Sequence, residues 1–179
     1  MQLSLQKAQG SQNTFFVIDI RNQSFFTDKI MQQLALLLCN PSGMLNGADG
    51  VLYIDKGVAS DYQMRIFNAD GSEALMCGNG MRIVARWALE DSRSEKLMVE
   101  NVTQLAYDVQ FEPNFFNGVE AVRLQFPAAV IDATDIIYDQ EGLFVNQTIK
   151  GFYESILFTT VAMPNPHIIT IVDEIDYTE

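Results

Sequence analysis

Cysteine and histidine are scarce in this sequence, which limits the chemistry that it can carry. The 179 residues include two cysteines, Cys39 and Cys77, and one histidine, His167. A zinc site takes about four such ligands, so we expect no metal site. The histidine has no serine-hydrolase signature to accompany it, which argues against a Ser-His-Asp triad. Two separated cysteines do not make a disulfide framework, so we expect reduced thiols and a cytoplasmic protein.

Long apolar runs and clusters of basic residues are also missing. No stretch is long enough to span a membrane, and Met1–Lys7 lacks the basic and apolar segments of an export signal. The net charge is −12, and only two of the 11 basic residues, Arg123 and Lys150, lie beyond residue 96. Binding to nucleic acid or to an anionic membrane would need a basic patch, so we expect neither partner.

Patterns that bind common cofactors are absent as well. No Gly-x-Gly-x-x-Gly or Walker pattern opens a helix, which argues against a nucleotide site. Lys150 is of the residue type that carries pyridoxal phosphate, but a lone lysine does not indicate such a site. We therefore expect no cofactor.

The composition is nevertheless that of a folded domain. Hydrophobic residues make up 48% of the chain, and a chain of this length normally forms one domain, predicted here for residues 1–179. Two segments have the apolar spacing of amphipathic helices. The first covers residues 28–39, with Thr27 or Asp28 as its N-cap, and the second covers residues 78–89.

The remaining apolar segments are short or alternate with polar residues, as strands do. Strands are predicted at Gln2–Lys7, Thr14–Ile20, Val51–Asp55, Gln63–Asn68, Lys96–Asn101, Leu105–Phe111, Glu120–Phe126, Leu157–Met163 and Ile168–Val172. Residues 112–118 are expected to form a turn between two strands. Many strands and few helices indicate an α+β fold, with a mostly antiparallel sheet wrapped on a helix.

The most informative segment is Asn-Ala-Asp-Gly-Ser-Glu-Ala-Leu-Met-Cys-Gly-Asn-Gly at residues 68–80. The second predicted helix follows directly, so Cys77 lies where that helix starts. The first N–H groups of a helix lack internal partners, and its positive end favours a thiolate and can hold a carboxylate. Gly78 and Gly80 would let a ligand approach the backbone. The segment predicts a proton-transferring thiol beside an anion-binding turn. The alternative for Cys77 is a small buried core residue.

Residues 68–80 resemble the first catalytic segment of the diaminopimelate epimerase family, which reads Asn-Ala-Asp-Gly-Ser-Glu, three variable residues and Cys-Gly-Asn-Gly at the same spacing. Lys7–Phe15 resembles the opening segment of that family, in which an asparagine contacts the substrate; Asn13 takes this place. Met-Pro-Asn-Pro-His at residues 163–167 resembles the family's Met-Gly-Asn-Pro-His, which implies a substrate contact for Asn165.

Three places depart from the family's pattern. Ala8-Gln9 and Thr14 differ from the usual residues on either side of the opening asparagine. Gly50 stands where some members carry a substrate-facing glutamine, and Pro164 replaces a glycine. These departures leave open a related amino-acid racemase of the same fold that acts on a different substrate.

The resemblance implies a closed, barrel-like sheet around a central helix, and an amino-acid epimerase that needs no cofactor. The reaction implied is LL-diaminopimelate to the meso isomer, for lysine and cell-wall synthesis. One thiolate removes the α-proton while a thiol on the opposite face returns one.

The resemblance also implies roles for single residues. Cys77 would be one of the two acid–base groups, and the backbone of Gly78 and Asn79 would bind the substrate carboxylate. Asn13, Asn68 and Asn165 would orient the ammonium and the distal end of the substrate. Residues expected to support the site without contacting substrate are Glu73 and Asp70, through capping or turn hydrogen bonds, and His167.

Family members have two similar halves, and the second cysteine lies in a Cys-Gly-Thr-Gly segment. This sequence has no such segment, and Cys39, at the far end of the first predicted helix, is expected to be structural. The chain therefore looks like the N-terminal half of the family fold, inactive by itself. Its expected partners are an amino-acid substrate and the missing half or a second chain, a homodimer included. A non-catalytic half-domain that binds or assembles is the remaining alternative.

Overall fold

The computed structural model describes residues 4–132, 136–137, 141–152, 155–163 and 165–173. The chain forms two compact units, Met1–Gln125 and Phe126–Glu179, and each is described by itself. No helix in the described ranges is long and apolar enough to cross a membrane. That residues 1–179 act as one domain stays a prediction.

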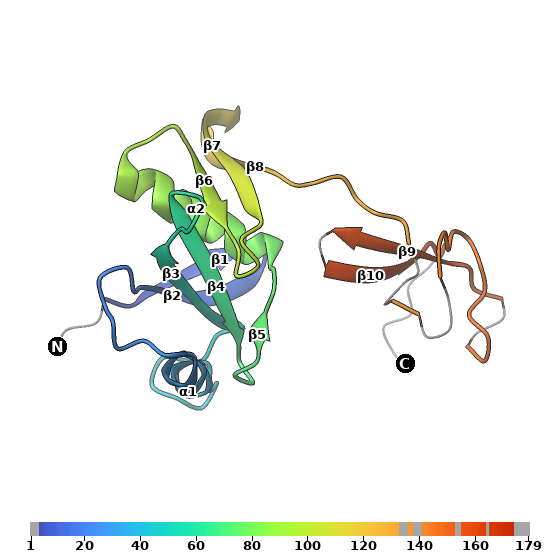
Figure 1. Ribbon diagram of the computed structural model, residues 1–179, viewed down its shortest axis with the longest axis horizontal. Coiled ribbons are helices and arrows are strands. Elements are labelled where there is room, and N and C mark those ends of the chain that lie inside the picture. Colours follow the sequence, from blue (N-terminus) through green and yellow to red (C-terminus); the bar gives the residue numbers. More distant parts are fainter. Residues whose placement is uncertain (1–3, 133–135, 138–140, 153–154, 164, 174–179) are drawn as a thin grey trace. The chain divides into compact units, whose positions relative to one another are not determined.

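The first unit is built on a mixed sheet of eight strands (Figure 1). The strands are β1 (Gln6–Gly10), β2 (Asn13–Asp19), β3 (Gly50–Lys56), β4 (Tyr62–Asn68), β5 (Glu73–Ala74), β6 (Lys96–Glu100), β7 (Ala106–Phe116) and β8 (Val119–Gln125). Their order is β1-β2-β3-β4-β6-β7-β8, and β5 pairs with β4. Only the β2–β3 and β4–β6 pairs of this sheet are parallel. The mostly antiparallel sheet predicted from the sequence is therefore confirmed.

Helix α2 (Gly78–Ser92) lies on one face of this sheet, as Figure 1 shows. It contacts β1, β2, β3, β4, β6, β7 and β8. Because the two edge strands β1 and β8 both contact the same helix, the sheet curls around it as a half-barrel. The helix buries residues at helical spacing, among them Met81, Val84, Ala85 and Ala88. The predicted α+β fold, a barrel-like sheet around a central helix, is confirmed, but in the described residues the sheet is a half-barrel and not closed, because β1 and β8 do not pair with each other.

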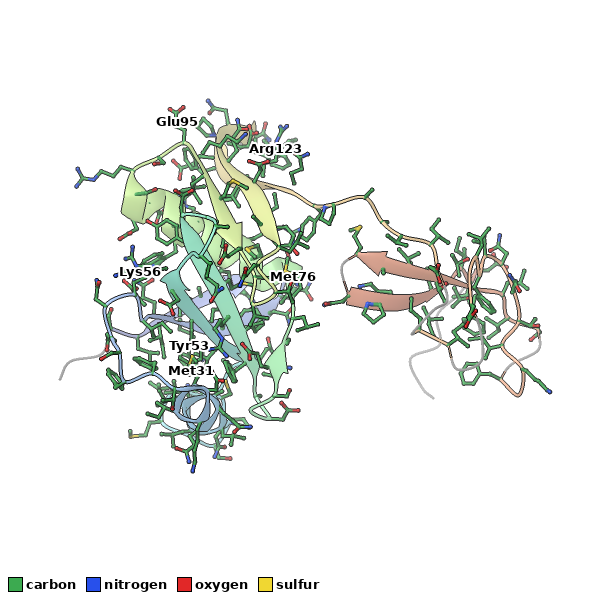
Figure 2. All side chains as sticks on the ribbon, in the orientation of Figure 1. Met31, Tyr53, Lys56, Met76, Glu95 and Arg123 are labelled. Atoms are coloured by element: carbon green, nitrogen blue, oxygen red, sulfur yellow. The ribbon has the colours of Figure 1, made fainter. Side chains whose placement is uncertain are left out.

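Helix α1 (Asp28–Leu38) packs against the opposite face of the sheet. Thr27 is its N-cap, and the Thr27 hydroxyl accepts the N–H of Ile30 at 3.4 Å. The helix buries Met31, whose carbonyl accepts the hydroxyl of fully buried Tyr53 at 2.8 Å (Figure 2). The predicted N-cap is thus confirmed, and a hydrogen bond inside the core joins α1 to β3.

Strand β3 is buried on both faces. Tyr53 faces α1, while its neighbour Leu52 faces α2, where a Cβ at Gly80 would lie 2.8 Å from the Leu52 side chain. Residues Val51 to Ile54 are all fully buried. A strand covered on both faces needs a continuous apolar run, which explains why its sequence does not alternate.

The first hairpin differs from the sequence prediction. A strand is predicted at Gln2–Lys7, but β1 runs from Gln6 to Gly10; residues 1–3 lie outside the described part. Ser11 and Gln12 turn the chain into β2 with φ of 49° and 74°. Two successive positive φ values are typical of a two-residue hairpin turn, which glycine and asparagine usually form. Ser11 and Gln12 are neither glycine nor asparagine, so this turn could not be recognised in the sequence.

The hairpin of β7 and β8 also corrects a prediction. The turn expected over residues 112–118 is wrong for most of that range, because β7 continues to Phe116. Only Asn117 and Gly118 form the turn, with φ of 49° and 79°. The register shifts between Glu112 and Phe116, so this part of β7 pairs irregularly. Irregular pairing weakens the alternation on which the sequence prediction depended.

Among the described residues of the second unit, β9 (Phe158–Met163) and β10 (Asn165–Thr170) form an antiparallel pair. Phe144 and Phe158 are buried together in the small core of this unit. The strand predicted at Leu157–Met163 is confirmed.

The strand predicted at Ile168–Val172 is shifted, because β10 starts at Asn165 and ends at Thr170. The departure noted at Pro164 lies outside the described residues.

Glu100 is a fully buried acid at the end of β6. Its carboxylate accepts the N–H groups of Val58 at 2.7 Å and Ala59 at 3.1 Å, and the Gln63 amide at 3.1 Å. Burial works against the charge, but these hydrogen bonds together outweigh it and leave the pKa of Glu100 below its usual 4.5. Glu100 therefore ties the loop before β4 to the sheet.

Replacing Glu100 by glutamine is expected to lower the free energy of unfolding by about 1–3 kcal/mol, because the new amide N–H groups face N–H donors. The lowered folded-state pKa means that the carboxylate stabilises the fold above its unfolded-state pKa. This stabilisation is lost as the pH falls through the folded-state pKa. Urea titrations at pH 7 and pH 3 measure the effect, which should shrink at pH 3.

The matched control is Glu95→Gln, which changes an exposed acid and should stay within about 0.5 kcal/mol of wild type. An equal loss for Glu100→Gln at both pH values would contradict the assignment.

Candidate active site

Cys77 is the N-cap of α2, as the sequence predicts. Its backbone is extended, with φ of −143° and ψ of 111°, and its side chain is half-buried. The Cys77 Sγ accepts the N–H of Gly80 at 3.3 Å, and the Cys77 carbonyl accepts the N–H of Met81 at 2.8 Å. A sulfur in the N-cap position thus takes the place of the hydroxyl or carboxylate that usually caps a helix. The thiol lies at the positive end of the helix dipole.

The first two N–H groups of α2 belong to Gly78 and Asn79. In the part of the chain that the structure describes, neither has a hydrogen-bond acceptor, as expected for the start of a helix. Both residues are half-buried. These donors stand next to Cys77 and can accept an anion such as a carboxylate.

From the sequence, Gly80 is expected to let a ligand approach the backbone, and the structure shows that it also has a packing role. It is buried, and an added Cβ would meet the Leu52 side chain at 2.8 Å. The glycine therefore lets the first turn of α2 approach β3 closely.

Asn13 and Asn79, which come from different elements, are in direct contact. The Asn79 side-chain amide donates to the Asn13 Oδ1 at 2.8 Å. Asn13 is the first residue of β2, and Asn79 belongs to the first turn of α2. The fold thus brings together two of the residues that the resemblance singled out, beside Cys77.

Asn68 lies in a tight turn that leads toward Cys77. Its side-chain amide donates to the Ser72 hydroxyl at 3.0 Å, and Ser72 in turn donates to Asp70 through its hydroxyl at 2.6 Å and its N–H at 2.9 Å. The Ser72 hydrogen bonds lower the pKa of the exposed Asp70 carboxylate. Asp70 thus makes the kind of turn hydrogen bonds that the sequence suggests.

Glu73 makes a different contact from the one expected. Where the structure describes the chain, Glu73 forms no cap or turn hydrogen bond but a two-point ion pair with Arg65, with N···O distances of 2.7 and 2.9 Å. Arg65 also reaches Asp28 at the start of α1, at 2.8 Å. The acid therefore joins β5 to β4 and, through Arg65, to α1. A hydrogen bond between neighbouring strands cannot be recognised from local sequence, which explains the difference.

Cys39, the second cysteine, is part of the core. It follows the last turn of α1, is 3% exposed, and packs with Met31 and Tyr53. Burial, reinforced by the charge of Asp49, raises the pKa of the Cys39 thiol to about 11. The expectation that Cys39 is structural is confirmed.

Asn165 and His167 belong to the second unit. Asn165 begins β10 opposite Met163, and exposed His167 pairs with Val161. Their roles at the site stay predictions.

Two residues that sequence reasoning missed, Arg82 and Asp49, extend the contact between the asparagines. An Arg82 guanidinium nitrogen donates to the Asn79 Oδ1 at 2.9 Å. Asp49 Oδ2 accepts the Asn13 amide at 3.3 Å and the N–H of Thr14 at 2.7 Å. Arg82 follows Asn79 by three positions, a spacing that places side chains on one helix face and could have been noticed. Asp49 lies too far from Asn13 in the sequence for any local signal.

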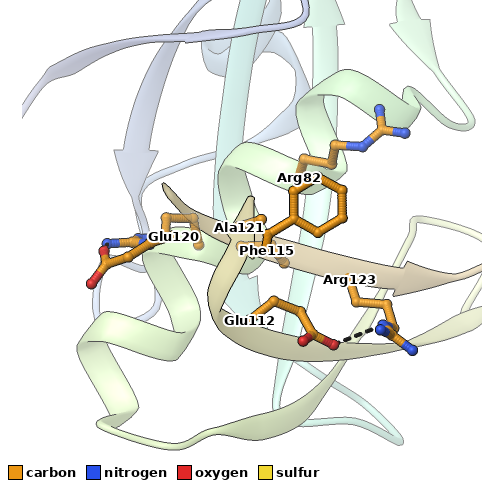
Figure 3. Close-up of a pocket in the computed structure, with 8 residues that line it drawn as sticks. Arg82, Glu112, Phe115, Glu120, Ala121 and Arg123 are labelled. Carbon is orange, nitrogen blue, oxygen red and sulfur yellow. Dashed lines mark hydrogen bonds and ion pairs between the residues drawn. The ribbon is translucent and has the colours of Figure 1, made fainter. Parts of the chain in front are cut away.

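A cavity of about 690 Å³ lies between α2 and the β7–β8 hairpin (Figure 3). Its lining residues are Arg82, Arg86, Glu112, Phe115, Glu120, Ala121, Val122 and Arg123. Arg123 pairs with Glu112 at 2.8 Å and Arg86 with Glu120 at 2.7 Å, whereas Arg82 bonds to Asn79. Within the described ranges, no three His, Cys, Asp or Glu side chains are grouped so that they could hold a metal ion.

A half-barrel sheet around a central helix is a fold that solved structures of other proteins share. A phenazine biosynthesis protein of the PhzF family from Bacillus anthracis matches with a TM-score of 0.57 and 15% identity, over 94% of this chain and 53% of that one. A hydroxyproline epimerase from Agrobacterium vitis matches with a TM-score of 0.51 and 16% identity, over 89% and 48%. The chain thus has a fold shared with epimerases.

The sequence identifies the family within this class. The diaminopimelate epimerase family profile matches residues 5–105, more than half of the chain, and the chain belongs to this family. The diaminopimelate epimerase of Enterococcus faecalis is 35% identical over 179 residues, which cover 97% of this chain and 54% of the relative. That of Listeria monocytogenes is 37% identical, over 94% of this chain and 52% of the relative. The chain spans about half the length of the curated relatives it matches.

Proposed function

We propose that the protein acts as a cofactor-independent amino-acid epimerase that converts LL-diaminopimelate to the meso isomer, for lysine and cell-wall synthesis. In this proposal the chain supplies one of two acid–base groups. The observation that carries it is the position of Cys77, a half-buried thiol that caps α2 beside N–H groups that can bind an anion.

The proposed chemistry is a proton transfer at the α-carbon. The Cys77 thiolate takes the α-proton and becomes a thiol, while a second acid delivers a proton to the opposite face of the carbanion. The two groups exchange protonation states, so the substrate keeps its atoms and its charge. Nothing is oxidised or reduced, which fits a reaction without a cofactor.

The carbanion needs stabilisation that the backbone of α2 can supply. The Gly78 and Asn79 N–H groups can bind the α-carboxylate, and the helix dipole favours the added negative charge. Donors that are already fixed in place stabilise a developing charge better than mobile water does. Asn13, Asn68 and Asn165 would bind the other polar groups of the substrate.

Diaminopimelate is proposed as the substrate because the similar proteins carry that name. The same site chemistry suits other amino acids, since only the α-carboxylate and the α-hydrogen take part in the reaction. A panel of amino acids in the test below therefore decides between diaminopimelate and another substrate.

The test joins residues 1–179 to the part of the Enterococcus faecalis relative that this chain does not cover, and measures α-deuterium uptake from D₂O. Loss of a general acid–base group typically costs about 10²–10⁴-fold in rate, so Cys77→Ala should slow exchange by this factor. The buried Cys39→Ala variant is the matched control and should retain activity once folding has been verified.

Two outcomes would contradict the proposal. Undiminished exchange in Cys77→Ala would remove Cys77 from the reaction. Exchange of another amino acid, with none for diaminopimelate, would favour the related racemase.

A further inference from the structure

Four side chains form a continuous row of hydrogen bonds next to Cys77. Arg82 donates to Asn79 at 2.9 Å, Asn79 donates to Asn13 at 2.8 Å, and Asn13 donates to Asp49 at 3.3 Å. The row runs from α2 to β2 and on to the residue before β3. The Asp49 carbonyl also accepts the N–H of Ala69 at 3.1 Å, which attaches the Asn68 turn to the same row.

The two ends of the row determine the direction of every bond between them. A guanidinium can only donate hydrogen bonds and a carboxylate can only accept them, whereas a side-chain amide can do both. Because Arg82 donates to the Asn79 oxygen, the Asn79 nitrogen must face Asn13. Because the Asn13 oxygen then accepts this bond, the Asn13 nitrogen must face Asp49. Neither amide can rotate by 180° without two donors or two acceptors meeting.

The charges lie at the exposed ends and the amides in the half-buried middle. Arg82 and Asp49 are exposed, while Asn13 and Asn79 are half-buried. Hydrogen bonds that involve a charged group are stronger than neutral ones. The two charged residues thus hold the amides from the two exposed ends of the row.

We propose that Arg82 and Asp49 are positioning residues that lock the Asn13 and Asn79 amides in one orientation beside Cys77. The proposal rests on the proposed function only in assigning the Asn13 side chain and the Asn79 backbone to substrate binding. Neither Arg82 nor Asp49 contacts the reacting atoms, and both act through the asparagines.

The test uses the 179-residue chain without substrate. Exchange of the Asn13 and Asn79 side-chain amide protons with water is measured by NMR in Arg82→Leu. Loss of one hydrogen bond should speed exchange about fivefold at Asn79. A similar change should follow at Asn13, which Arg82 does not touch, and Arg82→Lys should restore slow exchange at both. In Asp49→Ala, exchange should become faster at Asn13, which Asp49 touches, and also at Asn79, which it does not touch. Exchange in the double variant Arg82→Leu with Asp49→Ala should be about as fast as in either single variant.

Arg86→Leu is the matched control, since Arg86 lies one turn further along α2 and pairs with Glu90 and Glu120 instead. It should leave both amides unchanged, and thermal melting should show every variant folded. Unchanged exchange at Asn13 in Arg82→Leu, or an equal change in Arg86→Leu, would overturn the proposal. Because no substrate is present, this result does not depend on the proposed function, which is tested separately by α-deuterium uptake.

Discussion

Iodoacetamide is expected to label Cys77 at least about a hundredfold faster than Cys39 in the folded chain at pH 8, because only the thiolate reacts. Cys39 is 3% exposed, and its pKa is raised to about 11. About one Cys39 in a thousand is therefore a thiolate at that pH. Cys77 is half-buried at a helix start, where the N–H of Gly80 faces its sulfur.

Mass spectrometry of peptides after brief labelling measures both rates in one sample. The same reaction in concentrated urea is the reference, since unfolding removes the burial of Cys39 and should bring the two rates within a few-fold of each other. Labelling of Cys39 as fast as Cys77 in the folded chain would count against the site. It would also contradict the burial of Cys39 in the core under α1.

The sequence was most informative where local rules decide the structure. Both helices, the Thr27 cap and the helix start at Cys77 follow from apolar spacing and capping chemistry. These features depend on residues within about two turns or one strand of each other.

Features that depend on distant residues could not be predicted. The Ser11-Gln12 turn has no glycine to mark it, and the two-residue strand β5 exists through pairing with β4. Asp49 and Asn13 meet only because β2 and β3 pair in parallel. The resemblance singled out Asn13 and Asn79, but their mutual hydrogen bond needed the fold. Site residues could thus be named from the sequence, but the hydrogen bonds between them depend on long-range strand pairing and could not be predicted.

The 179-residue chain alone is expected to fold but not to invert diaminopimelate. The proposed reaction needs a thiolate on one face of the α-carbon and an acid on the other. The chain has two cysteines, and Cys39 cannot serve as the second group, because it packs under α1 with Met31 and Tyr53. Cys77 lies at the start of α2, on the opposite side of β3. A single thiol returns a proton only to the face from which it took one, so exchange with retention is the most that Cys77 can support.

The measurement is incubation with LL-diaminopimelate in D₂O, followed by chiral chromatography and mass analysis, with the Enterococcus faecalis relative assayed in parallel. Inversion by the chain should be slower than in the relative by about 10²–10⁴-fold or more, the contribution of one acid–base group. Light scattering on the same sample reports whether the chain self-associates. This control matters because a second copy could bring a second Cys77 to the opposite face of the substrate. Inversion at the rate of the relative would show that copies of this chain build a complete site. Abolition of that activity by Cys77→Ala would then identify Cys77 as the group on both faces.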